Sequence, residues 1–200
     1  MVRNLLATLV LAATYGIVAC SSPSEAQSEV QSETAEQPSS EVDPAAALFP
    51  ESLLKEFLTW NPVTEGDRAF PSEGHQGQTV RVYFNQLARP AYETQDIDSI
   101  SFAPGSLIAK AVVEDSSTPA TRARRVYFMR KMNPGYDPAN NDWAYAFADR
   151  NGDKYTYNSR QGKVGLCITC HVAESKFDFV RTVEVFRKDR ETSPVANLLQ

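Results

Sequence analysis

Two cysteines and a histidine stand close together late in the chain, in the run Cys167-Ile168-Thr169-Cys170-His171. This C-x-x-C-H spacing is typical of c-type haem attachment, because two thiols one turn apart on a helix face can reach the two vinyl groups of one porphyrin. The adjacent His171 would then place a ring nitrogen beneath the iron. The motif therefore predicts one covalently attached haem c, bound through Cys167 and Cys170 with His171 as the iron ligand.

Three other uses of this motif are open, and each is less favoured. A zinc site needs four ligands, and only His75 remains to join the three residues of the motif if Cys20 has another role. A thioredoxin-like redox pair needs a βαβ setting, which the pattern of elements in this chain lacks. A disulfide between Cys167 and Cys170 would leave His171 without a function.

The position of the motif bears on the sixth ligand of the iron. Only 29 residues follow His171 and none is methionine, whereas soluble electron-carrier cytochromes c usually supply an axial methionine after the motif. Met129 and Met132 precede it in a predicted strand, where packing is the favoured role. His75 follows a glycine in a loop-like stretch, and we expect a surface or hinge histidine there rather than a sixth ligand. The sequence thus favours an open or water-filled iron site that binds or transforms small molecules.

The N-terminus resembles a lipoprotein export signal. Arg3 provides a positive charge, and residues 5–18 form a mostly apolar stretch too short to span a bilayer. The run Ile17-Val18-Ala19-Cys20 resembles the lipobox of bacterial lipoproteins, in which the cysteine is acylated and becomes the first mature residue. We expect residues 1–19 to be the signal peptide and Cys20 to anchor the protein in the bacterial periplasm, with the outer membrane favoured. Ordinary secretion with cleavage near Ala19 is the alternative.

Charge and composition separate a tail from a folded domain. Residues 20–47 hold six acids and no base, are rich in Ser, Glu, Gln and Pro, and contain no aromatic residue, which predicts a disordered tether. The remaining residues 48–200 carry 19 acids and 19 bases, enough chain for one domain with its own core. Such a neutral domain has no cationic surplus for phosphate groups, so we do not expect nucleic-acid binding.

The domain 48–200 reads as a sheet flanked by helices. A short amphipathic helix is expected after Pro50, ending by Asn61-Pro62, and Asn151-Gly152 favours a tight hairpin turn. Strands are predicted at 79–84, 107–113, 124–132 and 143–149. Four strands in succession without helical patterns between them predict an α+β fold: a mainly antiparallel β-sheet with an N-terminal helix and a C-terminal haem-bearing helix.

With these residues in view, the domain resembles the cytochrome P-460 family over roughly residues 48–187. The matching blocks, in the family's order, are GHQG at 74–77, VRVYFN at 80–85, PGSLIAK at 104–110, MNPGY at 132–136, DWAYAF at 142–147, CITCH at 167–171 and DFV at 178–180. The family includes enzymes that oxidise hydroxylamine and the beta-type cytochromes c-prime, which bind gases such as nitric oxide. The resemblance implies a homodimer with an antiparallel sheet and a five-coordinate, histidine-ligated haem.

The resemblance also gives Lys110 a role. The family's enzymes carry a bond from a lysine nitrogen to the porphyrin edge, and counting from the Gly105-Ser106 turn puts that lysine at Lys110. Lys110 is also the lone charge in an otherwise apolar run from Leu107 to Val113. Burial would lower its pKa and give the neutral amine that a nucleophile needs. The alternative is a lysine on an edge strand whose ammonium group reaches water.

A second implication of the resemblance is a distal acidic residue in the hydroxylamine-oxidising members. Counting back from Trp143 places Tyr127 at that position, and the neighbouring Phe128 is no carboxylate either. A phenol, with a reference pKa of about 10, is a poor base near neutral pH. Tyr127 and Phe128 would line a pocket suited to a neutral diatomic gas, and packing of both rings within the sheet is the alternative.

These expectations define two main functions. The first is an exported monohaem protein that oxidises hydroxylamine or a related small nitrogen compound and passes electrons to a periplasmic electron-transfer partner. The second is a haem protein that binds nitric oxide or another gas without turnover, for sensing, buffering or detoxification. An electron-transfer relay tethered to the membrane is a third.

Overall fold

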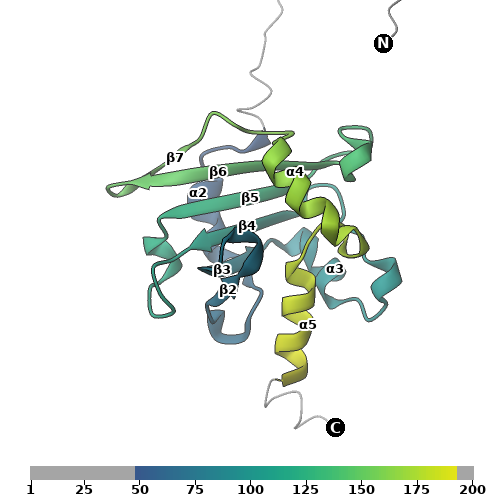
Figure 1. Ribbon diagram of the computed structural model, residues 1–200, viewed down its shortest axis with the longest axis horizontal. Coiled ribbons are helices and arrows are strands. Elements are labelled where there is room, and N and C mark those ends of the chain that lie inside the picture. Colours follow the sequence, from purple (N-terminus) through teal and green to yellow (C-terminus); the bar gives the residue numbers. More distant parts are fainter. Residues whose placement is uncertain (1–47, 193–200) are drawn as a thin grey trace, which may run out of the picture. The chain divides into compact units, whose positions relative to one another are not determined.

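The computed structural model describes residues 48–192, and a seven-stranded antiparallel sheet forms its centre (Figure 1). The strand order is β1-β3-β4-β5-β6-β7, and β2 also pairs with β3. The strands are β1 (Asn61–Pro62), β2 (Phe70–Ser72), β3 (Gln78–Phe84), β4 (Leu107–Val112), β5 (Arg125–Lys131), β6 (Trp143–Asn151) and β7 (Lys154–Tyr157). The predicted signal peptide, Cys20 and the tether lie outside the described residues.

The predicted α+β fold is confirmed, with the four predicted strands at β3, β4, β5 and β6. Each of these four pairs antiparallel with the next along the chain. The Asn151-Gly152 turn joins β6 to β7, and Gly152 has a positive φ of 60°. The sequence analysis missed β1 and β2, which are only two and three residues long and therefore carry almost no alternating pattern.

The helices are short and lie on both faces of the sheet. They are α2 (Leu53–Glu56), α3 (Arg89–Glu93), α4 (Gly165–His171) and α5 (Thr182–Thr192). The predicted N-terminal helix is present as α2 and a following 3₁₀ turn, and it ends before Asn61-Pro62, which pairs with β3 as β1. Within the described residues no helix is both long and apolar enough to cross a bilayer.

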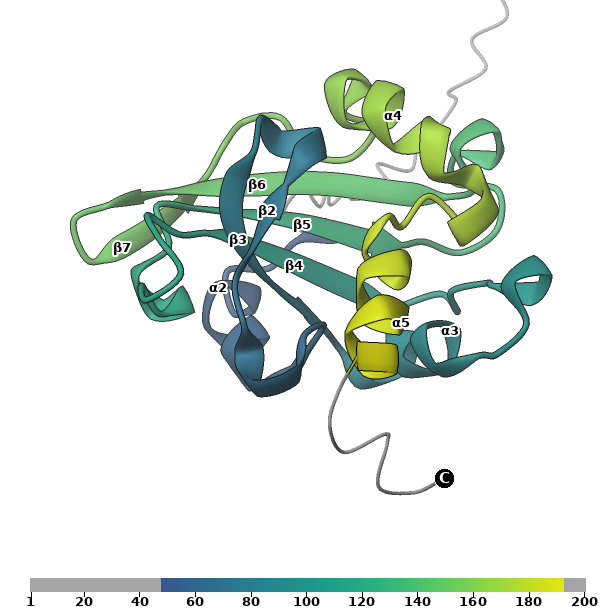
Figure 2. The ribbon, with the colours of Figure 1, turned by 60° about the horizontal axis from the view of Figure 1, so that its bottom comes forward.

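Alternating side chains divide the sheet into two faces, each with its own core. Val82, Ile108, Met129 and Tyr145 belong to the core on the face that α4 and α5 cover. The other face carries small and aromatic side chains that pack against α2 and the turn after it. Figures 1 and 2 show α4 and α5 on one side of the sheet and α2 on the other.

The hairpin of β2 and β3 extends beside α4 (Figure 2). A 3₁₀ turn, Glu73–His75, forms its tip, and the next two residues, Gln76 and Gly77, have positive φ values of 59° and 71°. Left-handed backbone at two successive positions reverses the chain within a few residues. This turn carries His75 to the face of the sheet that α4 covers.

Candidate functional site

The C-x-x-C-H motif lies on α4, as the sequence predicts. Cys167 is half-buried, Cys170 is exposed, and both are free thiols. None of the seven residues of α4 is buried, and Leu166 beside Cys167 is 75% exposed. A helix that carries apolar residues yet buries none has a face that the described protein leaves uncovered.

His171 ends this helix and is held in a defined orientation. Its Nδ1 lies 2.8 Å from the carbonyl oxygen of Phe179, so the Nδ1–H donates to that oxygen and Nε2 is the nitrogen left for a metal. Burial lowers the pKa of His171 to about 4, the hydrogen bond to Phe179 opposes this shift, and nearby Lys110 adds to it. The imidazole is therefore neutral at physiological pH, the form that binds metal.

A buried polar cluster fixes the backbone that presents the Phe179 carbonyl. Asp178 and Phe179 have positive φ values of 51° and 67°, which non-glycine residues adopt only where the surroundings hold them. The Asp178 carboxylate accepts hydrogen bonds from Lys131 Nζ at 2.7 and 2.9 Å, the Phe102 N–H at 2.7 Å, Trp143 Nε1 at 3.1 Å, and Asn141 Nδ2. The sequence analysis did not predict this cluster, although DFV at 178–180 was among the blocks of the resemblance.

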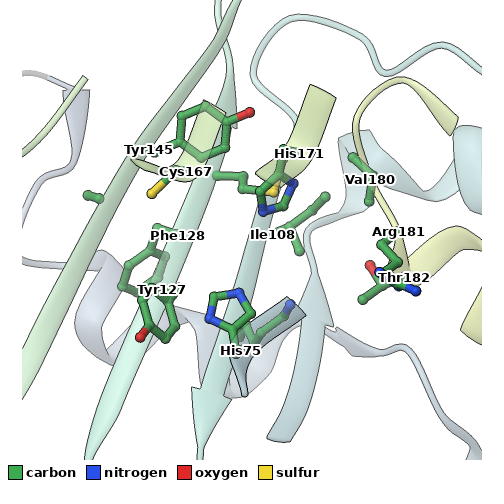
Figure 3. A pocket seen from close by; sticks show the side chains of 13 residues that line it. His75, Ile108, Tyr127, Phe128, Tyr145, Cys167, His171, Val180, Arg181 and Thr182 are labelled. Atoms are coloured by element: carbon green, nitrogen blue, oxygen red, sulfur yellow. The ribbon is translucent and has the colours of Figure 1, made fainter. Parts of the chain in front are cut away.

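The motif opens onto a cleft of about 400 Å³. A smaller and largely apolar cavity of about 40 Å³ shares part of its lining with this cleft, and Figure 3 shows the side chains around it. Both spaces are bordered by residues from α4, the β2–β3 hairpin, the sheet and the start of α5: His75, Lys110, Tyr127, Cys167, His171 and Arg181. The fold thus brings Lys110 and Tyr127 to the same cleft as the motif, as the sequence predicts for both.

Lys110 stands in the middle of the sheet. Its strand β4 lies between β3 and β5, which excludes the edge-strand alternative, and its register partners are Val82 and Tyr127. The Nζ atom donates to Ser72 Oγ at 3.3 Å. Burial, and to a lesser extent the positive charge of Arg181, lowers the pKa of Lys110 to about 8. A substantial neutral fraction is therefore available near neutral pH.

Tyr127 and Phe128 lie on opposite faces of β5. The Tyr127 ring lies on the cleft side, and its hydroxyl accepts a hydrogen bond from Arg125 Nη1 at 3.3 Å. Phe128 borders the inner cavity from its place in β5, but its ring packs edge-on against Phe57 in the opposite core, with centroids 6.0 Å apart. Successive strand residues point to opposite faces of the sheet, so of these two rings only that of Tyr127 faces a ligand in the cleft.

The structure places His75 in a turn, as its loop-like stretch predicts, but also against the cleft. We expected a surface or hinge histidine, but the side chain is half-buried and borders both the cleft and the inner cavity. Its ring packs against the Tyr127 ring with centroids 4.4 Å apart. Burial, then Lys110 and His171, lowers the pKa of His75 to about 3, so it is a neutral imidazole. No local pattern marks this position, because the contact depends on the turn after His75 and on the pairing of β2 with β3.

Three observations fit a large planar group in this cleft. The face of α4 with both thiols lacks protein cover, and His171 keeps Nε2 free toward the cleft. The Tyr145 hydroxyl, buried on the cavity wall, has no hydrogen-bond partner within residues 48–192, which is unusual for a buried polar atom. In the same part of the chain, no three His, Cys, Asp or Glu side chains are grouped to hold a metal ion, which does not favour the zinc alternative.

Comparison with known proteins agrees with the motif. A family model described as cytochrome P460 matches residues 55–182 of the chain. The matched range spans β1 to β7, the C-x-x-C-H motif on α4 and the first residue of α5. No curated protein matches the chain.

Proposed function

The chain belongs to the cytochrome P460 family, which implies haem binding, and on that premise we propose that it oxidises hydroxylamine or a related small nitrogen compound. The reaction would take place at one covalently attached haem c, in the cleft beneath α4. A single observation carries this proposal: the amine of Lys110 borders the same cleft as both His171 and Cys167. The family resemblance assigns to this lysine the bond that distinguishes the enzymes from gas-binding relatives.

The residues of the cleft are suited to covalent attachment of a haem. Cys167 and Cys170 would form the two thioether bonds, and His171 would ligate the iron through Nε2, oriented by the Phe179 carbonyl. Arg125 and Arg181 also border the cleft, and each is paired with carboxylates of the protein, Arg125 with Asp149 and Arg181 with Glu73 and Glu174. Once bound, the haem supplies an iron that can bind the substrate nitrogen and accept its electrons.

The side chains around the expected position of the iron would have different roles in the reaction. Lys110, with its lowered pKa, provides the amine for a bond to the porphyrin edge. Tyr127 forms part of the wall where a ligand would lie, and Met129 and Tyr145 line the inner cavity. The inner cavity is small and largely apolar, which fits a small neutral ligand such as hydroxylamine or nitric oxide.

The second candidate, binding of nitric oxide without turnover, is favoured by Tyr127. The resemblance expects a carboxylate at this position, and a phenol is a poor proton acceptor near neutral pH. The carboxylate that borders the cleft, Glu174, is already paired with Arg181 at 3.3 Å. Oxidation of hydroxylamine releases protons together with electrons and therefore needs a group that accepts protons, whereas binding of nitric oxide does not.

Export and anchoring complete the proposal. We propose a periplasmic protein, tethered to the outer membrane through acylated Cys20, that passes electrons to a soluble periplasmic electron-transfer protein. The lipobox-like run before Cys20 supports the anchor, and the haem motif agrees with it because bacteria attach haem c outside the cytoplasm. A homodimer follows from the family resemblance alone.

The absorption spectrum and turnover of the haem-loaded protein test the reaction. We expect a spectrum distinct from that of simple five-coordinate haem c, and reduction of an added one-electron acceptor that depends on hydroxylamine. A simple haem c spectrum, tight nitric oxide binding and no acceptor reduction would establish the gas-binding alternative instead.

A further inference from the structure

His75 and His171 approach one pocket from different parts of the fold. His171 comes from the end of α4, and His75 comes from the tip of the β2–β3 hairpin, 96 positions earlier in the chain. Figure 3 shows the two rings directed into the same pocket, with Ile108 beside them. A planar group ligated by His171 would therefore have the His75 ring on the hairpin side of the pocket.

Contacts on both sides of the hairpin tip keep His75 in place. Glu73 forms an ion pair with Arg181 at 2.8 Å, which joins the tip to the segment before α5. Ser72 accepts the hydrogen bond from Lys110, which joins the hairpin to the centre of the sheet. The Tyr127 ring packs against the imidazole of His75. The side chain is thus positioned by three separate elements rather than free in solution.

The charged groups of the cleft are already engaged. Arg125 binds Asp149 at 2.5 Å and donates to the Tyr127 hydroxyl. Glu174 is paired with Arg181. Within residues 48–192, no described hydrogen bond engages either ring nitrogen of His75. The imidazole keeps one donor and one acceptor available for a small molecule in the pocket.

We propose that His75 is the distal hydrogen-bonding residue of this haem site, and that its imidazole contacts the ligand at the sixth position of the iron. The inference rests on the proposed haem function and adds a specificity-determining residue to it. His75 would favour ligands that carry a polar atom beyond the one bound to iron, such as hydroxylamine or nitric oxide, over carbon monoxide, whose far atom is a weaker acceptor.

Two variants of similar volume test this role in the haem-loaded protein. His75→Leu removes the polar group, and His75→Gln restores an amide that can donate. For His75→Leu we expect nitric oxide to dissociate about tenfold faster, the size of one net hydrogen bond, with a shifted N–O stretching frequency. Carbon monoxide dissociation should change much less, and His75→Gln should recover most of the wild-type behaviour.

The outcomes separate this inference from the proposed function. Absence of covalent haem in the wild type would end both. With haem attached, equal nitric oxide dissociation and N–O stretch in wild type and His75→Leu would overturn the role of His75 alone. A low-spin ferric spectrum in the wild type that becomes high-spin in His75→Leu would also overturn it, since His75 would then ligate the iron itself.

Discussion

At the scale of single residues, Lys110 shows how position in the sheet changes the chemistry of a side chain. The same lysine on an edge strand would extend its ammonium group into water and keep its usual pKa. In β4 it lies between two strands with the cleft above it, and its pKa falls to about 8. About a tenth of such an amine is neutral at pH 7, compared with less than a thousandth for an ordinary lysine.

Replacing Lys110 decides between the two candidate functions. If Lys110 is bonded to the porphyrin, proteolysis of the wild type should release a haem peptide with two chain segments, one with the motif and one with Lys110. Lys110→Leu should then give the spectrum of simple five-coordinate haem c and abolish hydroxylamine oxidation, while nitric oxide still binds. Mass spectrometry of the haem peptide and the absorption spectrum measure this.

A matched control is Lys154→Leu, which removes an exposed lysine from β7. It should leave the haem peptide and the spectrum as in the wild type. A wild-type haem peptide with the motif segment alone would contradict the cross-link and leave gas binding as the leading function.

The two thiols allow a direct test of attachment. Cys167→Ala combined with Cys170→Ala should abolish covalent haem, because no other cysteine lies in the described residues. The measurement is peroxidase staining of a denaturing gel, in which only covalently bound haem stays with the chain. Cys20→Ser serves as the control and should keep the stain, and full staining of the double variant would refute attachment at this motif.

At the scale of elements, the segment between α4 and α5 depends on one buried ion pair. The side chains of Asp178 and Lys131 are 1% and 8% exposed, so water could not replace either partner of this ion pair. A buried pair contributes little to stability as a whole, but loss of one member leaves the other charge uncompensated. The pair therefore acts mainly to hold the left-handed backbone that directs the Phe179 carbonyl to His171.

Asp178→Asn should lower the free energy of unfolding by about 3–5 kcal/mol, because Lys131 stays buried without its counter-charge. Asparagine tolerates the positive φ at this position, so backbone strain does not add to the effect. Denaturant unfolding of the haem-loaded protein measures the loss. Addition of Lys131→Met should restore part of the stability, and strictly additive effects of the two changes would show that the pair is not coupled.

At the scale of the whole molecule, the charge of the chain is divided between a neutral haem domain and an acidic stretch next to the proposed anchor. Residues 20–47 carry six acids and no base, and together with Arg3 they account for the whole formal net charge of −5. Like charges along a segment favour extended conformations. In the anchored protein that we propose, this stretch would link Cys20 to the haem domain.

Fractionation of cells tests the anchor. Cys20→Ser removes the acylation site, and the protein should move from the membrane fraction to the soluble periplasmic fraction with its haem still attached. Ser21→Ala is the matched control and should stay with the membranes. Equal membrane association of wild type and Cys20→Ser would contradict the lipoprotein assignment.

Local features of the sequence indicated the haem motif and determined most of the sheet. The C-x-x-C-H motif needs only the spacing of one helical turn, and the strands β3 to β6 show their alternation within each segment. Lys110 stood out because a lone charge in an apolar run is visible without a structure. The antiparallel order of these four strands was predicted from the lack of helical patterns between them, although the short helix α3 lies between β3 and β4.

Only the tertiary structure decided which side chains surround the cleft. His75 reaches it because the turn after Glu73–His75 has left-handed backbone and β2 pairs with β3. Phe128 packs in the opposite core because its neighbour Tyr127 occupies the cleft side of β5. The contact of Asp178 with Lys131 joins residues 47 positions apart. Such contacts depend on pairing and packing between distant segments, which spacing within one segment does not specify.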